Sequence, residues 1–413
     1  MLLILYEFYA FSTQVKSTYN KTDNPNIMII LKKIFYAGII GISVFEILNV
    51  FFIMPMPGSQ EIKSLDIAYF LYSNRWIFRL CFVIMIAIGA INAFKIKRKW
   101  LPAAGLVIAI TIIYFFNFQM TAEKIFRQPG KLIFKGQADN RLSLNSIVIG
   151  VENNGKTKAY PIQFLVYHHQ VQDTIGGKPF MVTYCSVCRT GRVYEPLVKG
   201  HPEKFRLVGM DHFNAMFEDI TTRSWWRQGT GEAVTGPLKG ESLPEIASEQ
   251  LTIKKLFELH PDALIMQADA GSLTRYDSLR KFEQGLSEGR LTRTDSLSWK
   301  NKSWVIGVKI GTMNKVYDWN QLKKNRLITD SIGKIPVVIV LSTDGQSFTA
   351  FAHQHMNDSI RIMTDSLQIN GEIYDFSGRC LTTGLSSLER VAAYQEFWHS
   401  WKTFNSETHR IQL

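Results

Sequence analysis

Cysteine and charged residues are both scarce in this chain of 413 residues. Four cysteines are too few for a disulfide-stabilised scaffold. Charged residues make up 20% and hydrophobic residues 46%, a balance too apolar for a disordered chain. The sequence also lacks a nucleophile elbow, an HExxH zinc-protease motif and a kinase signature. None of the common hydrolase or kinase classes is therefore indicated.

The positive net charge of +12 does not come from a cluster of basic residues of the kind that binds nucleic acid. Residues 1–119 hold 11 Lys and Arg against 5 Asp and Glu, which leaves +6 there and +6 for the much longer remainder. After residue 120 the chain has no block of like charge and no basic stretch with interleaved aromatics. We therefore expect no nucleic-acid partner.

Long apolar runs account for much of the hydrophobic content. Three runs have the roughly 20 residues that a helix needs to cross the hydrocarbon, namely 34–54, 76–94 and 101–119. Lys32 and Lys33 precede the first run, and four basic residues within 95–99 separate the second from the third. Under the positive-inside rule both clusters are cytoplasmic. The sequence predicts a multi-pass protein of the inner (cytoplasmic) membrane, with the bilayer as its partner and its C-terminal domain outside the cytoplasm.

Two ionisable residues fall inside these runs. Glu46 and Arg79 both lie toward the outer ends of their helices, where the arginine can reach the carboxylate. We expect a structural ion pair between two helices, in preference to a transport or proton-relay role.

The apolar stretch Met1–Phe11 contains Glu7 and lacks the basic start and cleavage site of a signal peptide, so it is either an interfacial stretch or precedes a true start at Met28.

The outer part contains an internal repeat. An ungapped comparison of 146–182 with 303–339 gives about a dozen identities in roughly 37 positions, far above chance. Each copy reads as strand, turn, strand, short helix, turn, strand, and helical stretches near Leu251–His260 and Leu388–Thr403 close the two copies. The unbroken aliphatic run Val337–Leu341 indicates a strand buried on both faces. The fold class is α+β, with two β-rich lobes packed face to face and a cleft between them.

The expected organisation has five parts. They are an N-terminal segment of uncertain status (1–27), a membrane region with three transmembrane helices (28–120), a first lobe with the Cys-x-x-Cys pair (121–266), a polar, turn-rich linker (267–302) and a second lobe that is a degenerate repeat (303–413).

The first copy alone carries a Cys-x-x-Cys pair. Cys185 and Cys188 follow its last strand, and the second copy has Ser342 to Gly345 at this point. Three interpretations remain open: a knuckle for zinc, copper or iron, a redox dithiol, or structural and inert thiols. The Gly and β-branched residues after Cys188 favour a hairpin over the helix of a thioredoxin-like site.

A tetrahedral metal site needs two further ligands. The candidates are His168 and His169 before the Cys-bearing strand, and Met210 and His212 after it. His168 and His169 face Asn325 and Arg326 in the other copy, so they are confined to the copy with the cysteines. The predicted metal ligands are therefore Cys185, Cys188, His168 and His212. No catalytic residue is assigned.

A tryptophan pair offers a different kind of site. Trp225 and Trp226 follow Arg223 and could form a stacking platform for a ligand, although core packing is the commoner role of such residues. This leaves a second hypothesis, a non-enzymatic ligand-binding or protein-binding module with structural cysteines.

These residues resemble the bacterial and archaeal family of unknown function DUF3179. The matching positions are Ala159-Tyr160-Pro161, Tyr167-His168-His169, Gln172-Asp173, Gly176-Gly177, Thr183 to Thr190 and Ser224-Trp225-Trp226. The family pattern has Glu at His169, Pro at Ser186 and Gly at Arg189, and the changes to His169 and Arg189 make the expected pocket more basic. The resemblance covers the chain from about residue 140 onward and implies no particular activity.

The leading hypothesis is thus a membrane-anchored extracytoplasmic protein with one metal or dithiol redox site in its first lobe. The sequence names no reaction, substrate or partner protein.

Overall fold

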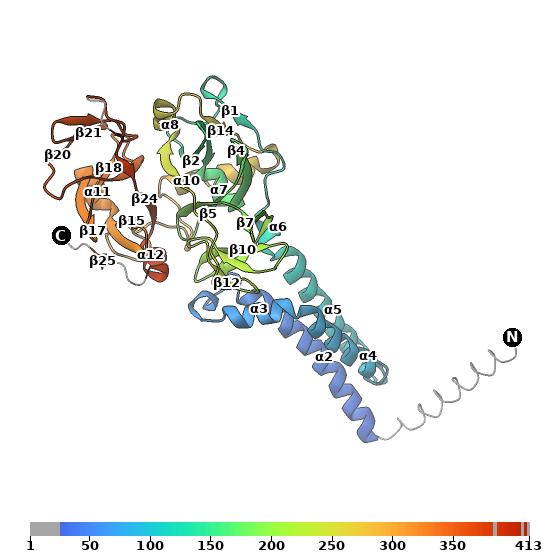
Figure 1. The fold of residues 1–413 in the computed structure, drawn as a ribbon. Helices are drawn as coiled ribbons and strands as arrows, with labels where there is room; N and C mark the ends of the chain where they lie inside the picture. The colour runs from blue at the N-terminus through green and yellow to red at the C-terminus, as the bar shows by residue number, and fades with distance from the viewer. Residues whose placement is uncertain (1–24, 383–385, 406–408, 411–413) are drawn as a thin grey trace. The chain divides into compact units, whose positions relative to one another are not determined.

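The computed structural model describes residues 25–382, 386–405 and 409–410. The chain forms two compact units, one ending at Ile125 and the other beginning at Phe126 (Figure 1). Most of the predicted N-terminal segment, including Met1–Phe11, lies outside the described residues.

The first unit is helical. Its helices are α2 (Pro25–Phe51), η1 (Ser59–Glu61), α3 (Leu65–Ser73), α4 (Arg75–Phe94), α5 (Trp100–Tyr114), the π-helical turn η2 (Phe115–Gln119) and α6 (Ala122–Ile125). Within the described part of the chain, three helical spans are long and apolar enough to cross a membrane: Pro25–Phe51, Arg75–Phe94 and Trp100–Gln119. Large apolar side chains on them face outward, for example Ile77 at 62% and Val107 at 62% exposure. Such a surface is stable in hydrocarbon and costly in water.

Small residues let α2 and α4 pack closely. Phe35 and Ile39 of α2 are buried with Ala93 of α4. A Cβ atom on Gly89 of α4 would lie 2.3 Å from the carbonyl oxygen of Leu31, so only glycine allows this approach. This is the small-residue packing typical of helices in a bilayer.

The expected ion pair inside these helices is confirmed. Arg79 donates from Nε and Nη2 to the two carboxylate oxygens of Glu46, at 2.7 and 2.9 Å, and Glu46 is 1% exposed. The sequence did not reveal the third member, Asn117 of η2, which donates to Glu46 Oε2 at 2.9 Å and accepts from Arg79 Nη2 at 2.6 Å. One polar network therefore links α2, α4 and the end of the third span.

The second unit is β-rich and begins with a strand-rich half. Its elements are β1 (Phe134–Lys135), η3 (Gln137–Asp139), β2 (Ile147–Asn153), β3 (Lys156–Pro161), α7 (Ile162–His168), β4 (Gln170–Ile175), β5 (Lys178–Cys185), β6 (Thr190–Tyr194), β7 (Leu197–Val198), β8 (His201–Pro202), β9 (Phe205–Asp211), β10 (Asn214–Asp219), β11 (Trp225–Arg227), β12 (Ala233–Thr235), β13 (Glu249–Thr252), α8 (Ile253–Leu259) and β14 (Leu264–Met266). The polar connection that follows contains η4 (Ala270–Ser272), α9 (Leu273–Ser278) and α10 (Arg280–Glu283), which bury Tyr276 and Phe282 in the core around α7.

The remaining elements complete the second unit. They are β15 (Trp304–Ile310), β16 (Met313–Asp318), α11 (Trp319–Asn325), β17 (Leu327–Ile332), β18 (Ile335–Leu341), β19 (Phe348–Ala352), β20 (Ile360–Met363), β21 (Ser366–Ile369), β22 (Glu372–Tyr374), β23 (Glu389–Arg390), β24 (Ala392–Phe397), α12 (Trp398–Phe404) and β25 (His409–Arg410). As expected, Val337–Leu341 is a fully buried strand, with every residue at most 1% exposed.

The largest sheet runs through both parts of this unit. Its strand order is β1-β14-β3-β2-β13-β19-β18-β17, with β23 added beside β19. Strand β13 therefore joins β2 on one side to β19 on the other.

The expected helix over Leu388–Thr403 is wrong for its first half, because Ala392–Phe397 pairs in register with β15 and helix α12 begins only at Trp398. Long-range strand pairing overrides the local helical preference of this segment.

Two buried arginines join the Cys-bearing hairpin to β24. Arg192 of β6 donates from Nη2 to Glu396 at 2.7 Å, and the two side chains are 1% and 3% exposed. Arg189 donates from Nε to Gln395 at 3.2 Å and from its terminal nitrogens to the backbone carbonyls of Phe282 and Glu283. The hairpin and the C-terminal strand are thereby fixed to each other.

The Arg192–Glu396 pair gives a test of this junction. We expect Arg192→Met to lower the free energy of unfolding by about 3–5 kcal/mol, because it leaves Glu396 buried and unpaired. The double variant Arg192→Met/Glu396→Leu should recover most of that loss, since no buried charge remains. Denaturant unfolding of the full chain in detergent measures both.

The exposed pair Arg280–Asp277, at 75% and 67% exposure, provides the matched control. Arg280→Met should change the free energy of unfolding by less than about 1 kcal/mol. Equal losses in Arg192→Met and in the double variant would contradict the role of the buried charge.

Candidate functional site

The two cysteines lie in a tight turn between β5 and β6. Cys185 is the last residue of β5 and pairs with Thr190 across the hairpin, and Cys188 lies in the turn. Both side chains are fully buried, and neither is in a disulfide. Arg189 follows with a φ of 55°, in the left-handed region. Glycine adopts that conformation most easily, so an arginine here needs contacts that offset the cost.

A second turn covers the sulfurs. The hairpin of β9 and β10 presents the backbone carbonyl of Phe213 to both thiols, at 3.4 Å from Cys185 Sγ and 3.3 Å from Cys188 Sγ. The side-chain amide of Asn214 donates to Cys188 Sγ at 3.4 Å. His212 and Phe213 both have positive φ, at 48° and 65°. Two consecutive non-glycine residues in this conformation are strained, and such strain is concentrated at functional sites.

The two thiols differ in acidity. Burial raises the pKa of both. In Cys185 this effect is outweighed by hydrogen bonds from the Cys188 thiol and from the backbone amides of Ala215, Cys188 and Val187, which hold its pKa below the usual value. Burial and the neighbouring Cys185 raise the pKa of Cys188 well above it. The pair therefore loses its first proton readily and its second with difficulty.

A cation and a histidine from the second half of the unit adjoin this turn. Lys302 donates from Nζ to the Val187 carbonyl at 2.7 Å, and His399 Nε2 lies 3.0 Å from the same oxygen. Burial lowers the pKa of Lys302 to about 8, although the two cysteines favour its charged form. Burial and Lys302 lower the pKa of His399 to about 4, so its imidazole is neutral at pH 7.

The predicted histidine ligands make other contacts. Burial lowers the pKa of His168, whose Nδ1 contacts the carbonyl oxygen of Arg127 and whose Nε2 lies 2.5 Å from the hydroxyl of Tyr276. His212 Nδ1 lies 2.6 Å from Asp211 Oδ1. Among the described residues no group of three or more His, Cys, Asp or Glu side chains could hold a metal ion. The four-ligand set of Cys185, Cys188, His168 and His212 stays a prediction.

The sequence pointed to the hairpin at residues 209–214 through Met210 and His212, and the structure places other atoms of that hairpin against the sulfurs. The Phe213 carbonyl and the Asn214 amide contact the sulfurs, and neither carries a metal-ligand signal. Lys302 and His399 were missed because they lie more than 100 residues further along the chain.

Two further expectations are settled by burial. Trp225 and Trp226 are 0% and 2% exposed and donate their indole N–H groups to Glu218 and Asp219, so core packing is confirmed. The expected basic pocket at His169 and Arg189 is wrong, because both side chains are about 1% exposed. The Arg189 guanidinium also lies 3.6 Å over the Trp304 ring.

The buried His169 makes stability depend on pH. Burial lowers its pKa to about 4, while its ring donates from Nδ1 to the Tyr184 carbonyl, 2.8 Å away. Between pH 6.5 and 4 the unfolded chain binds a proton that the folded chain does not. The free energy of unfolding should therefore fall as the pH falls through this window, by up to about 1.4 kcal/mol per unit from this residue.

His169→Asn should remove this part of the slope, since asparagine tolerates the left-handed backbone at this position, where φ is 61°. Urea unfolding between pH 4 and 7 measures the slope, and His201→Asn on the exposed β8 is the control. An unchanged slope in His169→Asn would show that its imidazole is protonated in the folded chain.

Comparison with known proteins agrees with the sequence motifs. Residues 130–408 match a family model described as "Protein of unknown function (DUF3179)". A search of curated proteins and a search of solved structures each gave no match. The match spans more than half of the chain and includes both cysteines, the hairpin over them, and Lys302 and His399. The chain is a member of the DUF3179 family, with helices apolar enough to cross a membrane ahead of the family domain.

Proposed function

We propose that this chain is a membrane-anchored extracytoplasmic protein whose β-rich domain carries a reversible dithiol–disulfide centre at Cys185 and Cys188. The observation that carries the proposal is geometric: two free, buried thiols lie three residues apart on one turn, and both contact the Phe213 carbonyl, at 3.4 and 3.3 Å. The lowered pKa of Cys185 and the raised pKa of Cys188 support it. A low-pKa cysteine beside a protonated partner is the arrangement that thiol–disulfide exchange requires.

The proposed topology rests on the charges that flank the helices. Lys32 and Lys33 lie near the start of α2, and Lys95, Lys97 and Lys99 lie between α4 and α5. With both clusters on the cytoplasmic side, the third span ends outside and the DUF3179 domain follows it there. An extracytoplasmic compartment is oxidising enough to support a disulfide.

A duplication of the domain is supported by matching elements and contacts. The order β2-β3-α7-β4-β5 recurs as β15-β16-α11-β17-β18. The Tyr160 hydroxyl donates to Asp173 at 2.8 Å, and at the equivalent position Tyr317 donates to Asp330 at 3.0 Å. We infer two lobes, 121–266 and 303–413, joined by 267–302. In this arrangement the second lobe, with no cysteine pair of its own, covers the site of the first with α12.

The proposed chemistry uses the pair in sequence. The Cys185 thiolate attacks a disulfide of a small thiol compound, which releases one thiolate and forms a mixed disulfide. Cys188 then loses its proton and displaces the second thiolate, giving the Cys185–Cys188 bond and two reduced thiols. Lys302 stabilises the negative charge that appears at Cys188. Because both sulfurs are buried, the turn at Phe213 must move before exchange.

Redox titration tests the centre. In a Cys81→Ser/Cys380→Ser background, the full chain in detergent is equilibrated with oxidised and reduced dithiothreitol at a series of ratios. It is then unfolded in an alkylating reagent, and its mass is measured by mass spectrometry. We expect one two-electron transition between a species with two alkyl groups and a species with none. Two alkyl groups at every ratio would contradict the proposal.

Accessibility is tested by alkylation of the folded, reduced chain. Both thiols should react at least about ten times more slowly than in the unfolded chain, because reactivity requires exposure. Phe213→Gly should accelerate the reaction, since it removes the ring that packs edge-on against His399, 6.3 Å between centroids, and so loosens the turn, while glycine retains the backbone at a φ of 65°. A fast reaction in the unmodified chain would show that the turn does not protect the sulfurs.

A second candidate is a soft metal ion, zinc, copper or iron, held by Cys185 and Cys188 with His168 and His212 as the predicted helpers. It is favoured by the convergence of backbone amides on Cys185, as in a metal knuckle, and by the nearby Lys302, which offsets the charge of two thiolates. Elemental analysis of purified chain should then find stoichiometric metal that is absent from Cys185→Ser/Cys188→Ser. No metal together with no redox transition would leave a binding module with structural cysteines.

A further inference from the structure

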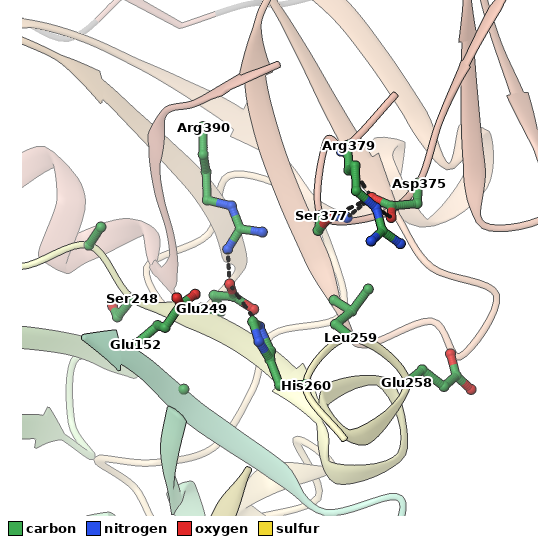
Figure 2. Close-up of a pocket in the computed structure, with 12 residues that line it drawn as sticks. Glu152, Ser248, Glu249, Glu258, Leu259, His260, Asp375, Ser377, Arg379 and Arg390 are labelled. Carbon is green, nitrogen blue, oxygen red and sulfur yellow. Dashed lines mark hydrogen bonds and ion pairs between the residues drawn. The ribbon is translucent and has the colours of Figure 1, made fainter. Parts of the chain in front are cut away.

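A polar cavity is lined by residues other than those that contact the two cysteines. It has a volume of about 500 Å³, within the range of small-molecule sites (Figure 2). Its walls come from β2, the segment from Ala247 through β13 and α8 to His260, and the segments around 375–379 and 390. The lining residues are Gly150, Glu152, Ala247, Ser248, Glu249, Glu258, Leu259, His260, Asp375, Ser377, Arg379 and Arg390.

One wall is negative and partly unsatisfied. Glu249 Oε1 forms ion pairs with Arg390 Nη1 and, at 3.5 Å, with His260 Nε2. Glu249 Oε2 is buried with no hydrogen-bond partner among the described residues. Glu152, which is exposed, also lines the cavity and lies on β2, whose Gly150 pairs with Glu249 of β13. A buried carboxylate oxygen without a donor is costly, and a ligand N–H group would satisfy it.

The opposite wall offers a guanidinium. Arg379 is held through Nε by Asp375 at 3.2 Å, and its side chain is 71% exposed. Figure 2 shows its terminal nitrogens pointing toward Leu259, into the space that separates it from Glu249 and His260. A guanidinium positioned in this way can bind a carboxylate through two parallel hydrogen bonds.

We propose that this cavity binds a small zwitterion of about dipeptide size, with its ammonium group at Glu249 and Glu152 and its carboxylate at Arg379. A simple anion would meet the two glutamates, and a simple cation would make no use of the terminal nitrogens of Arg379. Both charges of the ligand are therefore needed. The site is independent of the thiol chemistry proposed for Cys185 and Cys188.

Titration calorimetry on the full chain in detergent tests the proposal with three probes that differ only in their ends. Alanyl-alanine carries both charges, N-acetyl-alanyl-alanine lacks the ammonium group, and alanyl-alanine amide lacks the carboxylate. We expect the zwitterion to bind at least roughly ten-fold more tightly than either blocked form, because each lost contact is a charge-assisted hydrogen bond.

Variants assign the two ends. Glu152→Gln should lower the affinity for alanyl-alanine without changing the affinity for N-acetyl-alanyl-alanine. Arg379→Gln should abolish the preference of the chain for alanyl-alanine over alanyl-alanine amide. Both side chains are exposed, so these variants should fold as the parent does. Glu249→Gln should weaken binding further but also loses two ion pairs, so its unfolding midpoint is measured in parallel. Arg361→Gln, on an exposed position of β20 outside the cavity, is the control and should leave binding unchanged.

Equal affinity for the three probes, or no heat from alanyl-alanine at millimolar concentration, would overturn the proposal. So would unchanged affinity in both Glu152→Gln and Arg379→Gln. The Cys185→Ser/Cys188→Ser variant should bind alanyl-alanine as the parent does, which separates failure of this site from failure of the dithiol proposal.

Discussion

The burial of Arg189 and Arg192 is the interaction on which the second unit, from Phe126 onward, depends. Both guanidiniums lie at about 1% exposure, where an unpaired charge would be prohibitively costly. Each must therefore keep its partners on the connecting segment and on β24, namely Glu396, Gln395 and two carbonyls of 282–283. This requirement fixes where β24 runs. The backbone amide of Phe397 then bonds to the carbonyl of Cys188, and α12 begins one residue later.

That placement explains both what the sequence predicted and what it could not. The aliphatic strand β18 and the Glu46–Arg79 pair follow from local patterns or from the cost of charge in hydrocarbon, which need no knowledge of distant residues. The environment of the cysteines depends on residues 213, 302 and 399, which only long-range packing brings to the turn. The helix predicted over 388–397 is wrong for the same reason, since the strand with which this segment pairs, β15, begins over 80 residues earlier.

Backbone conformation gives a signal that residue types alone do not. His169, Arg189, His212 and Phe213 all have positive φ, and all four lie in the turns around the two cysteines. Each costs of order 1 kcal/mol or more relative to glycine, and the surrounding contacts must offset this strain. At Arg189 the stabilising contacts are the hydrogen bonds to backbone carbonyls and the stacking of the guanidinium on the Trp304 ring. The strained turn at Arg189 is thus accompanied by hydrogen bonds to Phe282, Glu283 and Gln395 elsewhere in the domain.

The same contacts link the thiol turn to the polar cavity. Glu249 of the cavity begins β13, and the next residue, Gln250, donates to Gln395 at 3.2 Å. Gln395 in turn accepts from Arg189, the residue after Cys188. A shift of β24 that exposed the sulfurs would have to break the Gln250 and Arg189 bonds together, because they share one amide oxygen. Strand β13, which carries Glu249 of the cavity, and the cysteine turn therefore share the side-chain oxygen of Gln395 as a hydrogen-bond acceptor.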